Sequence, residues 1–138
     1  MACSTSMRNK LIGEYFGTVS DKPTTWYCGL SSVDINADGS GFVEPSSDSG
    51  YARVAIPVST VYWTTPTSGY IQNKLPVTFD ELTTNEDTVT NIFLAQSETG
   101  NADFWQKLET EDYKHLDKGT TILFNEGDYK ISIENSTD

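Results

Sequence analysis

Cysteine and histidine are scarce in this sequence, and their scarcity excludes several kinds of chemistry. The two cysteines, Cys3 and Cys28, are too few for a disulfide framework and belong to no CxxC or Cys/His pattern that could hold zinc. We expect both to be reduced. The one histidine, His115, lies in a charged stretch where a surface position is expected, and no phosphate-binding glycine loop is present. The sequence therefore predicts a protein that is not an enzyme.

Basic residues and long apolar runs are also few. Nine Lys and Arg stand against twenty Asp and Glu, which gives a formal charge of -11. Because neutralisation of phosphates supplies most of the sequence-independent affinity for nucleic acid, this charge argues against DNA, RNA or an anionic membrane as a partner. No apolar run approaches the about 20 residues that span a bilayer, and the N-terminus lacks the apolar segment of a signal peptide. We expect no nucleic-acid or membrane partner, and synthesis in a cytoplasm.

The residues that are abundant predict a mostly β fold. The chain has 138 residues, 36% of them hydrophobic and 12% aromatic, which is enough for one folded domain spanning 1–138. Helical spacing occurs at about 6–16, where one face could pack on the domain's own sheet, as we expect, or dock on a partner. The residues of that face are Met7, Leu11, Ile12, Tyr15 and Phe16.

Short strand-like runs follow, in a β core of about 25–134. They lie at 25–31, 51–63, 77–79, 88–97, 104–108, 122–124 and 129–135, at spacings that are typical of a single antiparallel β-sandwich or barrel-like domain. We expect Trp105 to return beside the strand at 88–97 as a hairpin, and the last two strands to form a closing pair. Residues 64–76 are expected to be turn-like.

A polar stretch at about 32–50, rich in Gly, Ser and Asp, joins two of these strands. Its DINADG turn places Asp34, Asn36 and Asp38 at alternate positions, and such spacing lets a short loop surround a calcium ion with oxygen ligands. An EF-hand is not expected, because Pro45 stands where the bidentate glutamate is needed and no helix flanks the turn. A calcium site of another type and a solvated turn without metal are the two alternatives.

Two further groups of residues are candidate contact sites. Arg53 lies inside a strand-like run, where it either pairs with a carboxylate such as Glu44, within or between subunits, or is simply exposed. Three aromatic residues gather in the turn-rich region that follows. They would stack on a sugar or form an interface, or else pack in the core. These residues are Tyr62, Trp63 and Tyr70.

Three phrases occur in order over nearly the whole chain: YCGLSS, NADGSGFVEPSSDSGYARVAI and LDKGTTILFNEGDYKISIE. Together they resemble a family of small β-rich bacteriophage virion proteins that are commonly labelled tail fibre or minor tail proteins. The specific part is GxxEP followed by GYARV, which contains Glu44 and Arg53. The resemblance implies a non-enzymatic structural protein of the virion and a recurrent structural contact at these two residues. The match is weak over 60–115.

The resemblance also implies the partners of the chain. It would bind other virion proteins, either as a tail or tail-fibre component or as a capsid decoration protein, and would form a homo-oligomer such as a trimer. The alternative function is a host-surface carbohydrate-binding module that uses the exposed aromatic residues and, in one version, calcium. In either case the protein is made in the bacterial host cytoplasm and ends in the virion.

Overall fold

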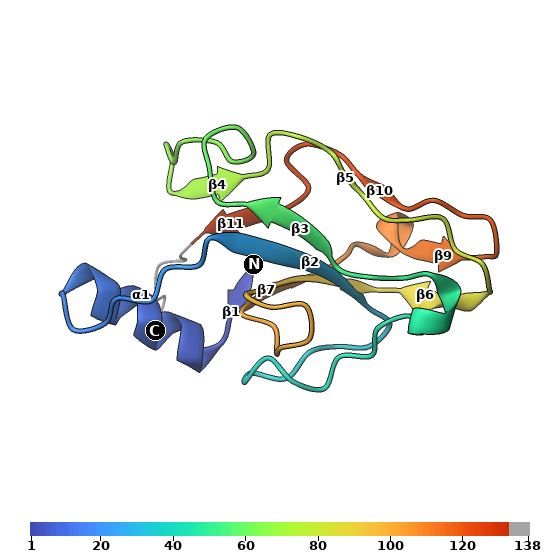
Figure 1. Ribbon diagram of the computed structural model, residues 1–138, viewed down its shortest axis with the longest axis horizontal. Helices are drawn as coiled ribbons and strands as arrows, with labels where there is room; N and C mark the ends of the chain where they lie inside the picture. The colour runs from blue at the N-terminus through green and yellow to red at the C-terminus, as the bar shows by residue number, and fades with distance from the viewer. Residues whose placement is uncertain (133–138) are drawn as a thin grey trace.

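The computed structural model describes residues 1–132, which form antiparallel β-sheets with one helix near the N-terminus (Figure 1). The largest sheet has five strands in the order β1-β8-β7-β2-β3, and each strand runs antiparallel to its neighbours. The strands of this central sheet are β1 (Ala2–Cys3), β2 (Thr25–Ser31), β3 (Val54–Pro57), β7 (Asn91–Ala95) and β8 (Phe104–Lys107). The expected hairpin of β7 and β8 is present, with Phe93 opposite Trp105.

Three two-stranded ladders complete the β structure of residues 1–132. They pair β4 (Tyr70–Gln72) with β11 (Lys130–Ser132), β5 (Val77–Thr78) with β10 (Leu123–Phe124), and β6 (Glu86–Val89) with β9 (Lys114–Leu116). Two short 3-10 helices, η1 (Ser47–Ser49) and η2 (Thr110–Asp112), lie in the connections. The predicted mostly β, antiparallel fold is confirmed, and no barrel closes within these residues.

Both faces of the central sheet are buried. Successive side chains along β2 and β7 point to opposite faces, so each strand contributes residues to both. On one face, Cys28, Leu30, Ile92 and Leu94 pack into the main hydrophobic core, which the ladders and their connections complete. On the other face, Phe93 belongs to a second, smaller cluster with residues of the long loop between β2 and β3. The long loop therefore covers a face that an antiparallel sheet commonly exposes to water.

Helix α1 (Thr5–Tyr15) lies close to its predicted position but packs differently. It begins where the Ser4 hydroxyl accepts a hydrogen bond from the Met7 N–H at 3.0 Å, and it ends before Gly17, which has a φ of 77°. Met7 is buried, but the rest of the apolar stripe is exposed, so the expectation that the whole stripe packs on the sheet is wrong. The reason is visible in Figure 1, where α1 extends away from the strands beyond its first turn. Within residues 1–132, no helix is long and apolar enough to cross a membrane.

The last two strands do not form the predicted closing pair. Strand β10 pairs with β5, and β11 pairs with β4. The side chain of Asn73, directly after β4, explains the second pairing, because its Oδ1 accepts hydrogen bonds from the N–H groups of Gly127 and Tyr129, each at 3.0 Å. These bonds draw the chain after β10 toward β4. The part of the predicted β core at 133–134, and the end of the predicted strand 129–135, lie outside the described residues.

Other strand boundaries also differ from the prediction. The predicted strand at 88–97 is two strands, β6 and β7, which separate at Thr90, where the N–H donates to the Ser31 carbonyl at 3.0 Å. The predicted strand at 51–63 is reduced to β3. The turn-like region contains β4 and the charged stretch around His115 contains β9, each of three residues. Strands this short carry too little periodicity to be recognised from sequence.

Candidate functional site

The long loop, residues 32–53, leaves β2 and folds back over the outer face of the central sheet before β3 begins. Its two limbs are joined where the Ser32 N–H donates to the Val43 carbonyl at 2.9 Å. The hydroxyl of Ser31 strengthens this junction, since it donates to the Val33 carbonyl at 2.7 Å and accepts from the Val43 N–H at 3.1 Å. A polar stretch with few residues able to fill a core is thus held in one conformation by hydrogen bonds to the end of β2.

Close packing beneath the loop depends on glycine. The Phe42 ring lies 4.9 Å from the Phe93 ring, centroid to centroid, and Phe93 lies directly over Gly29, where an added Cβ would come within 2.2 Å of the ring. At the loop's tip, the Ala102 N–H donates to the Gly39 carbonyl at 2.9 Å. Gly39 has a φ of 86°, and a Cβ there would be 1.9 Å from the Ala102 carbonyl oxygen. The loop therefore packs directly against the sheet.

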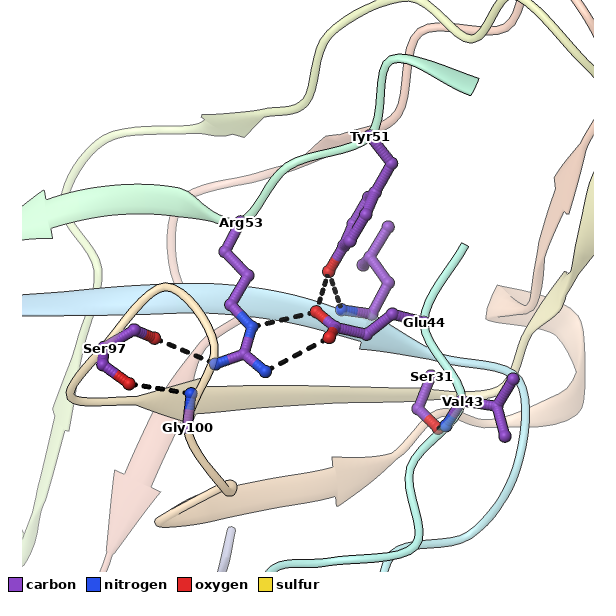
Figure 2. Close-up of polar contacts among 8 residues, drawn as sticks. Ser31, Val43, Glu44, Tyr51, Arg53, Ser97 and Gly100 are labelled. Carbon is purple, nitrogen blue, oxygen red and sulfur yellow. Dashed lines mark hydrogen bonds and ion pairs between the residues drawn. The ribbon is translucent and has the colours of Figure 1, made fainter. Parts of the chain in front are cut away.

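Glu44, inside the loop, and Arg53, at its end, lie together (Figure 2). Arg53 Nε and Nη2 donate to the two Glu44 carboxylate oxygens at 2.9 and 3.2 Å, and Arg53 Nη1 donates to the Ser97 carbonyl at 2.9 Å. The Tyr51 hydroxyl donates to Glu44 Oε1 at 2.6 Å and accepts from the Leu30 N–H at 3.1 Å. This cluster joins the loop, β2 and the β7–β8 turn, and its ion pair forms within one chain.

The surroundings of this cluster are largely desolvated. The Arg53 side chain is 1% exposed, and its guanidinium carbon lies 4.9 Å from the Phe93 centroid and 5.4 Å from the Phe42 centroid. Burial, and secondarily the Glu44 carboxylate, raise the pKa of Tyr51 well above its ordinary value, so its hydroxyl stays neutral. Because the charges and polar atoms satisfy one another, the cluster fastens the loop and provides no free nucleophile or base.

The residues predicted as calcium ligands lie in the turn at the loop's tip. Asp34 Oδ1 lies 3.6 Å from Lys107 Nζ. Asp38 Oδ1 accepts hydrogen bonds from the hydroxyl and the N–H of Ser40, at 2.6 and 3.0 Å, which lower the pKa of Asp38. The Asn36 N–H donates to the Ser40 carbonyl at 2.8 Å. Residues 1–132 contain no group of three or more His, Cys, Asp or Glu placed to hold a metal, and the calcium site stays a prediction.

The three candidate binding aromatics do not share one environment. Trp63 belongs to the main core and, with Tyr70, lines an apolar groove of about 760 Å³, whereas Tyr62 packs against the main core but does not line the groove. Trp26, which lies in the predicted strand at 25–31, lines the same groove. The buried Trp63 Nε1 has no hydrogen-bond partner in the described part of the chain. Lys130 Nζ lies 3.9 Å from the Tyr70 ring centroid, so a cation lies at the groove's margin.

Sequence reasoning missed Tyr51 and Phe42 as partners of the ion pair. A signal for Tyr51 existed, because alternation along GYARV places it on the same side as Arg53. Phe42 is a large aromatic residue in the Gly-, Ser- and Asp-rich part of the loop, and such a residue needs a surface to cover it.

An open antiparallel fold, with a long loop fastened by a buried ion pair, defines a small β-rich structural domain. Over residues 2–132 the chain matches the family described as Gp80, podophage GP4 fiber I protein gp80. The chain belongs to this family of bacteriophage fibre proteins, and the resemblance to β-rich phage virion proteins is confirmed. A comparison with curated proteins finds no match.

Proposed function

We propose that this chain is a non-enzymatic component of a phage tail fibre, built as one domain and bound to other virion proteins. The observation that carries the proposal is the family match, which extends over residues 2–132 and includes the fastened loop. A fibre role favours the tail over capsid decoration. In the fibre the chain forms a homo-oligomer, and a trimer is the state we expect.

The described side chains support a role without catalysis. His115 Nδ1 lies 3.2 Å from Thr88 Oγ1, and a base beside a hydroxyl is what nucleophilic catalysis requires. However, His115 is exposed on the β6–β9 ladder, and within residues 1–132 no third side chain is hydrogen-bonded to the ring to orient it. Glu44 and Arg53, the buried charged pair, are occupied by each other.

Gold-labelled antibodies raised against this chain test the proposal on intact particles. Label on the tail fibres is the expected result. Label spread over the head would overturn the tail assignment and make the chain a capsid decoration protein. No label on any particle would overturn the virion role.

A second candidate function is a host-surface carbohydrate-binding module. The observation in its favour is the groove, where Trp26, Trp63 and Tyr70 offer ring faces of the kind on which sugars stack. Tryptophan fluorescence during titration with host cell-wall glycan fragments tests this function. A saturable change that Trp63→Phe weakens would support it, and a change abolished by a calcium chelator would add a role for the DINADG turn. No change would count against glycan binding.

A further inference from the structure

The outward side of α1 presents a cluster of apolar side chains that the described part of the chain leaves uncovered. We call Ile12, Tyr15 and Phe16 the α1 face; they are 60%, 85% and 78% exposed. The rings of Tyr15 and Phe16 lie 5.8 Å apart, centroid to centroid, and so form one surface. Scattered exposed apolar residues are common, but a contiguous cluster with two aromatic rings marks an interaction site.

The α1 face is carried by a defined scaffold. The segment after the helix folds back on it, with the N–H groups of Thr18 and Val19 donating to the Gly13 carbonyl at 2.9 and 3.2 Å. An ion pair also joins this segment to the helix, since Lys22 Nζ lies 3.4 Å from a Glu14 carboxylate oxygen. The α1 face is therefore held in shape before any partner binds, which lowers the entropic cost of binding.

A hollow adjoins this face. The apolar groove of about 760 Å³ has a volume within the range of about 300–1,000 Å³ typical of ligand sites. Met7 and Leu11 of α1 contribute to its wall, so the α1 face and the groove belong to one continuous surface. Among residues 1–132, no charged side chain lines the groove, and its other wall residues include Trp26, Val58, Trp63, Tyr70 and Ile71.

The segments that form this surface contain few of the chain's acidic residues. Residues 49–79, which supply much of the groove wall, contain no Asp or Glu and two cations, Arg53 and Lys74. Residues 1–22, which contain α1, have three Lys or Arg and two Asp or Glu. The other eighteen acidic residues lie outside both segments. Because copies with a formal charge of -11 repel each other elsewhere, contact between copies costs least here.

We propose that the α1 face of one copy seats in the groove of a second copy of this chain. The contact joins a convex surface to a concave one, so it forms either a reciprocal pair or a head-to-tail assembly, which is a ring where the rotation closes. Tyr15 and Phe16 would each bury about 150–250 Å². With the groove wall, this approaches the about 800 Å² per partner of a stable interface. The proposal rests on the chain acting in an oligomeric fibre, and it names the surface that forms the oligomer.

Light scattering during size-exclusion chromatography, with each protein at the same concentration, tests the contact. The double variant Tyr15→Ser/Phe16→Ser removes the α1 face, and Val58→Asp places a charge in the groove at a residue that is 49% exposed. We expect an oligomer for the unmodified chain and at least about tenfold weaker association for each variant, because aromatic anchors dominate interfaces. The control is Leu123→Ser, which alters another exposed apolar residue, 43% exposed and on β10, and should leave the mass unchanged.

Mixing the two variants tests which surfaces meet. Each variant retains the part that the other lacks, so a mixture should form pairs of one copy of each variant, joined by one intact contact, if the α1 face contacts the groove. Circular dichroism spectra of both variants should match the spectrum of the unmodified chain, since the altered residues are exposed and their loss leaves the fold intact.

The proposal would be overturned by a monomeric unmodified chain, by an oligomer that both variants leave intact, or by a mixture that stays dissociated. A Val58→Asp variant that stays oligomeric but loses glycan binding would also overturn it and assign the groove to a sugar. Gold label at the tail together with a monomeric chain would refute this contact and leave the fibre role standing.

Discussion

Glu44 and Arg53 form a bidentate ion pair that joins the interior of the long loop to its last residue, directly before β3. The two N–H···O distances are 2.9 and 3.2 Å, and the side chains are 23% and 1% exposed. Since Arg53 is almost completely desolvated, its charge depends on Glu44 for compensation. The pair is therefore more important for the position of the loop than an exposed ion pair would be.

Replacement of Glu44 by Gln should destabilise the protein strongly. The variant keeps the side-chain shape but leaves the Arg53 charge buried without a counterion, and loss of one partner of a buried pair costs about 3–5 kcal/mol. Urea denaturation monitored by tryptophan fluorescence would measure the free energy of unfolding. The double variant Glu44→Gln/Arg53→Met should recover part of the loss, because it removes the uncompensated charge.

The matched control for this variant is Asp34→Asn. Asp34 pairs with Lys107 at 3.6 Å, and both side chains are exposed, at 72% and 59%. Loss of such an exposed pair should cost less than about 1 kcal/mol. If Glu44→Gln cost as little as Asp34→Asn, the ion pair would not be what secures the loop.

The sequence allowed the Glu44–Arg53 contact to be proposed, but not the network around it. A charged pair within one motif, in a chain with few cations, is a local signal. Likewise, the strand-like runs at 25–31 and 88–97 predicted strands that form the centre of the sheet. The partners of β10 and β11 could not be predicted in this way, because short strands do not specify which segment they pair with.

The residues that line the groove could not be predicted as one site from the sequence either. Trp26, Trp63 and Tyr70 come from separate segments, and only the tertiary fold brings them to one hollow. The exposure of the α1 face was also not predictable, because a 3.6-residue period indicates an apolar side but not what covers it.

Asn73 makes the clearest tertiary contact that sequence reasoning missed. It is 1% exposed, and its Nδ2 donates to the carbonyls of Leu75 and Asn125 at 2.8 and 3.1 Å, while Oδ1 accepts from the N–H groups of Gly127 and Tyr129. Asn73→Ala should leave several buried backbone groups without this partner and cost at least about 3 kcal/mol in unfolding free energy.

Asn85→Ala is the comparison for Asn73→Ala. The Asn85 side chain accepts one hydrogen bond, from the Lys118 N–H at 2.7 Å, at an exposed site. Its loss should cost about 0.5–1.5 kcal/mol. Equal melting temperatures for the two variants would mean that the Asn73 hydrogen bonds do not hold the chain after β10 against β4.

Asp103 should make stability depend on pH. Burial raises the pKa of its carboxyl above the ordinary value of 3.8, although Lys10 opposes the shift. A raised pKa means that the folded state binds the proton more tightly than the unfolded state does, so the contribution of Asp103 is favourable below the ordinary pKa and is lost as the pH rises through the raised value.

The variant Asp103→Asn should therefore be more stable than the unmodified chain at pH 7 and should lose this advantage at pH 3. Thermal melts across that range would measure the difference. The exposed Asp38, whose pKa is lowered by Ser40, provides a control of opposite sign, because Asp38→Asn removes a group that favours folding above its pKa. A stability difference for Asp103→Asn that did not vary with pH would show that the carboxyl is not desolvated.

Gly29→Ala should test how closely the loop-covered face of the sheet is packed. Gly29 lies on central strand β2, and an added Cβ would come within 2.2 Å of the Phe93 ring, which Phe42 and Arg53 cover from the other side. Overpacking of this kind typically costs about 1–3 kcal/mol, because the ring must shift and the loop above it must follow.

A double-variant cycle with Phe93→Leu separates overpacking from a backbone effect. Removal of the ring should make Gly29→Ala nearly neutral, since the two positions are in contact and their effects should not add. The free energies of unfolding of the four proteins in urea give the coupling directly. Additive effects would mean that the Phe93 ring does not confine position 29. They would also argue against the close packing of the long loop on the sheet that the 4.9 Å distance between the Phe42 and Phe93 centroids indicates.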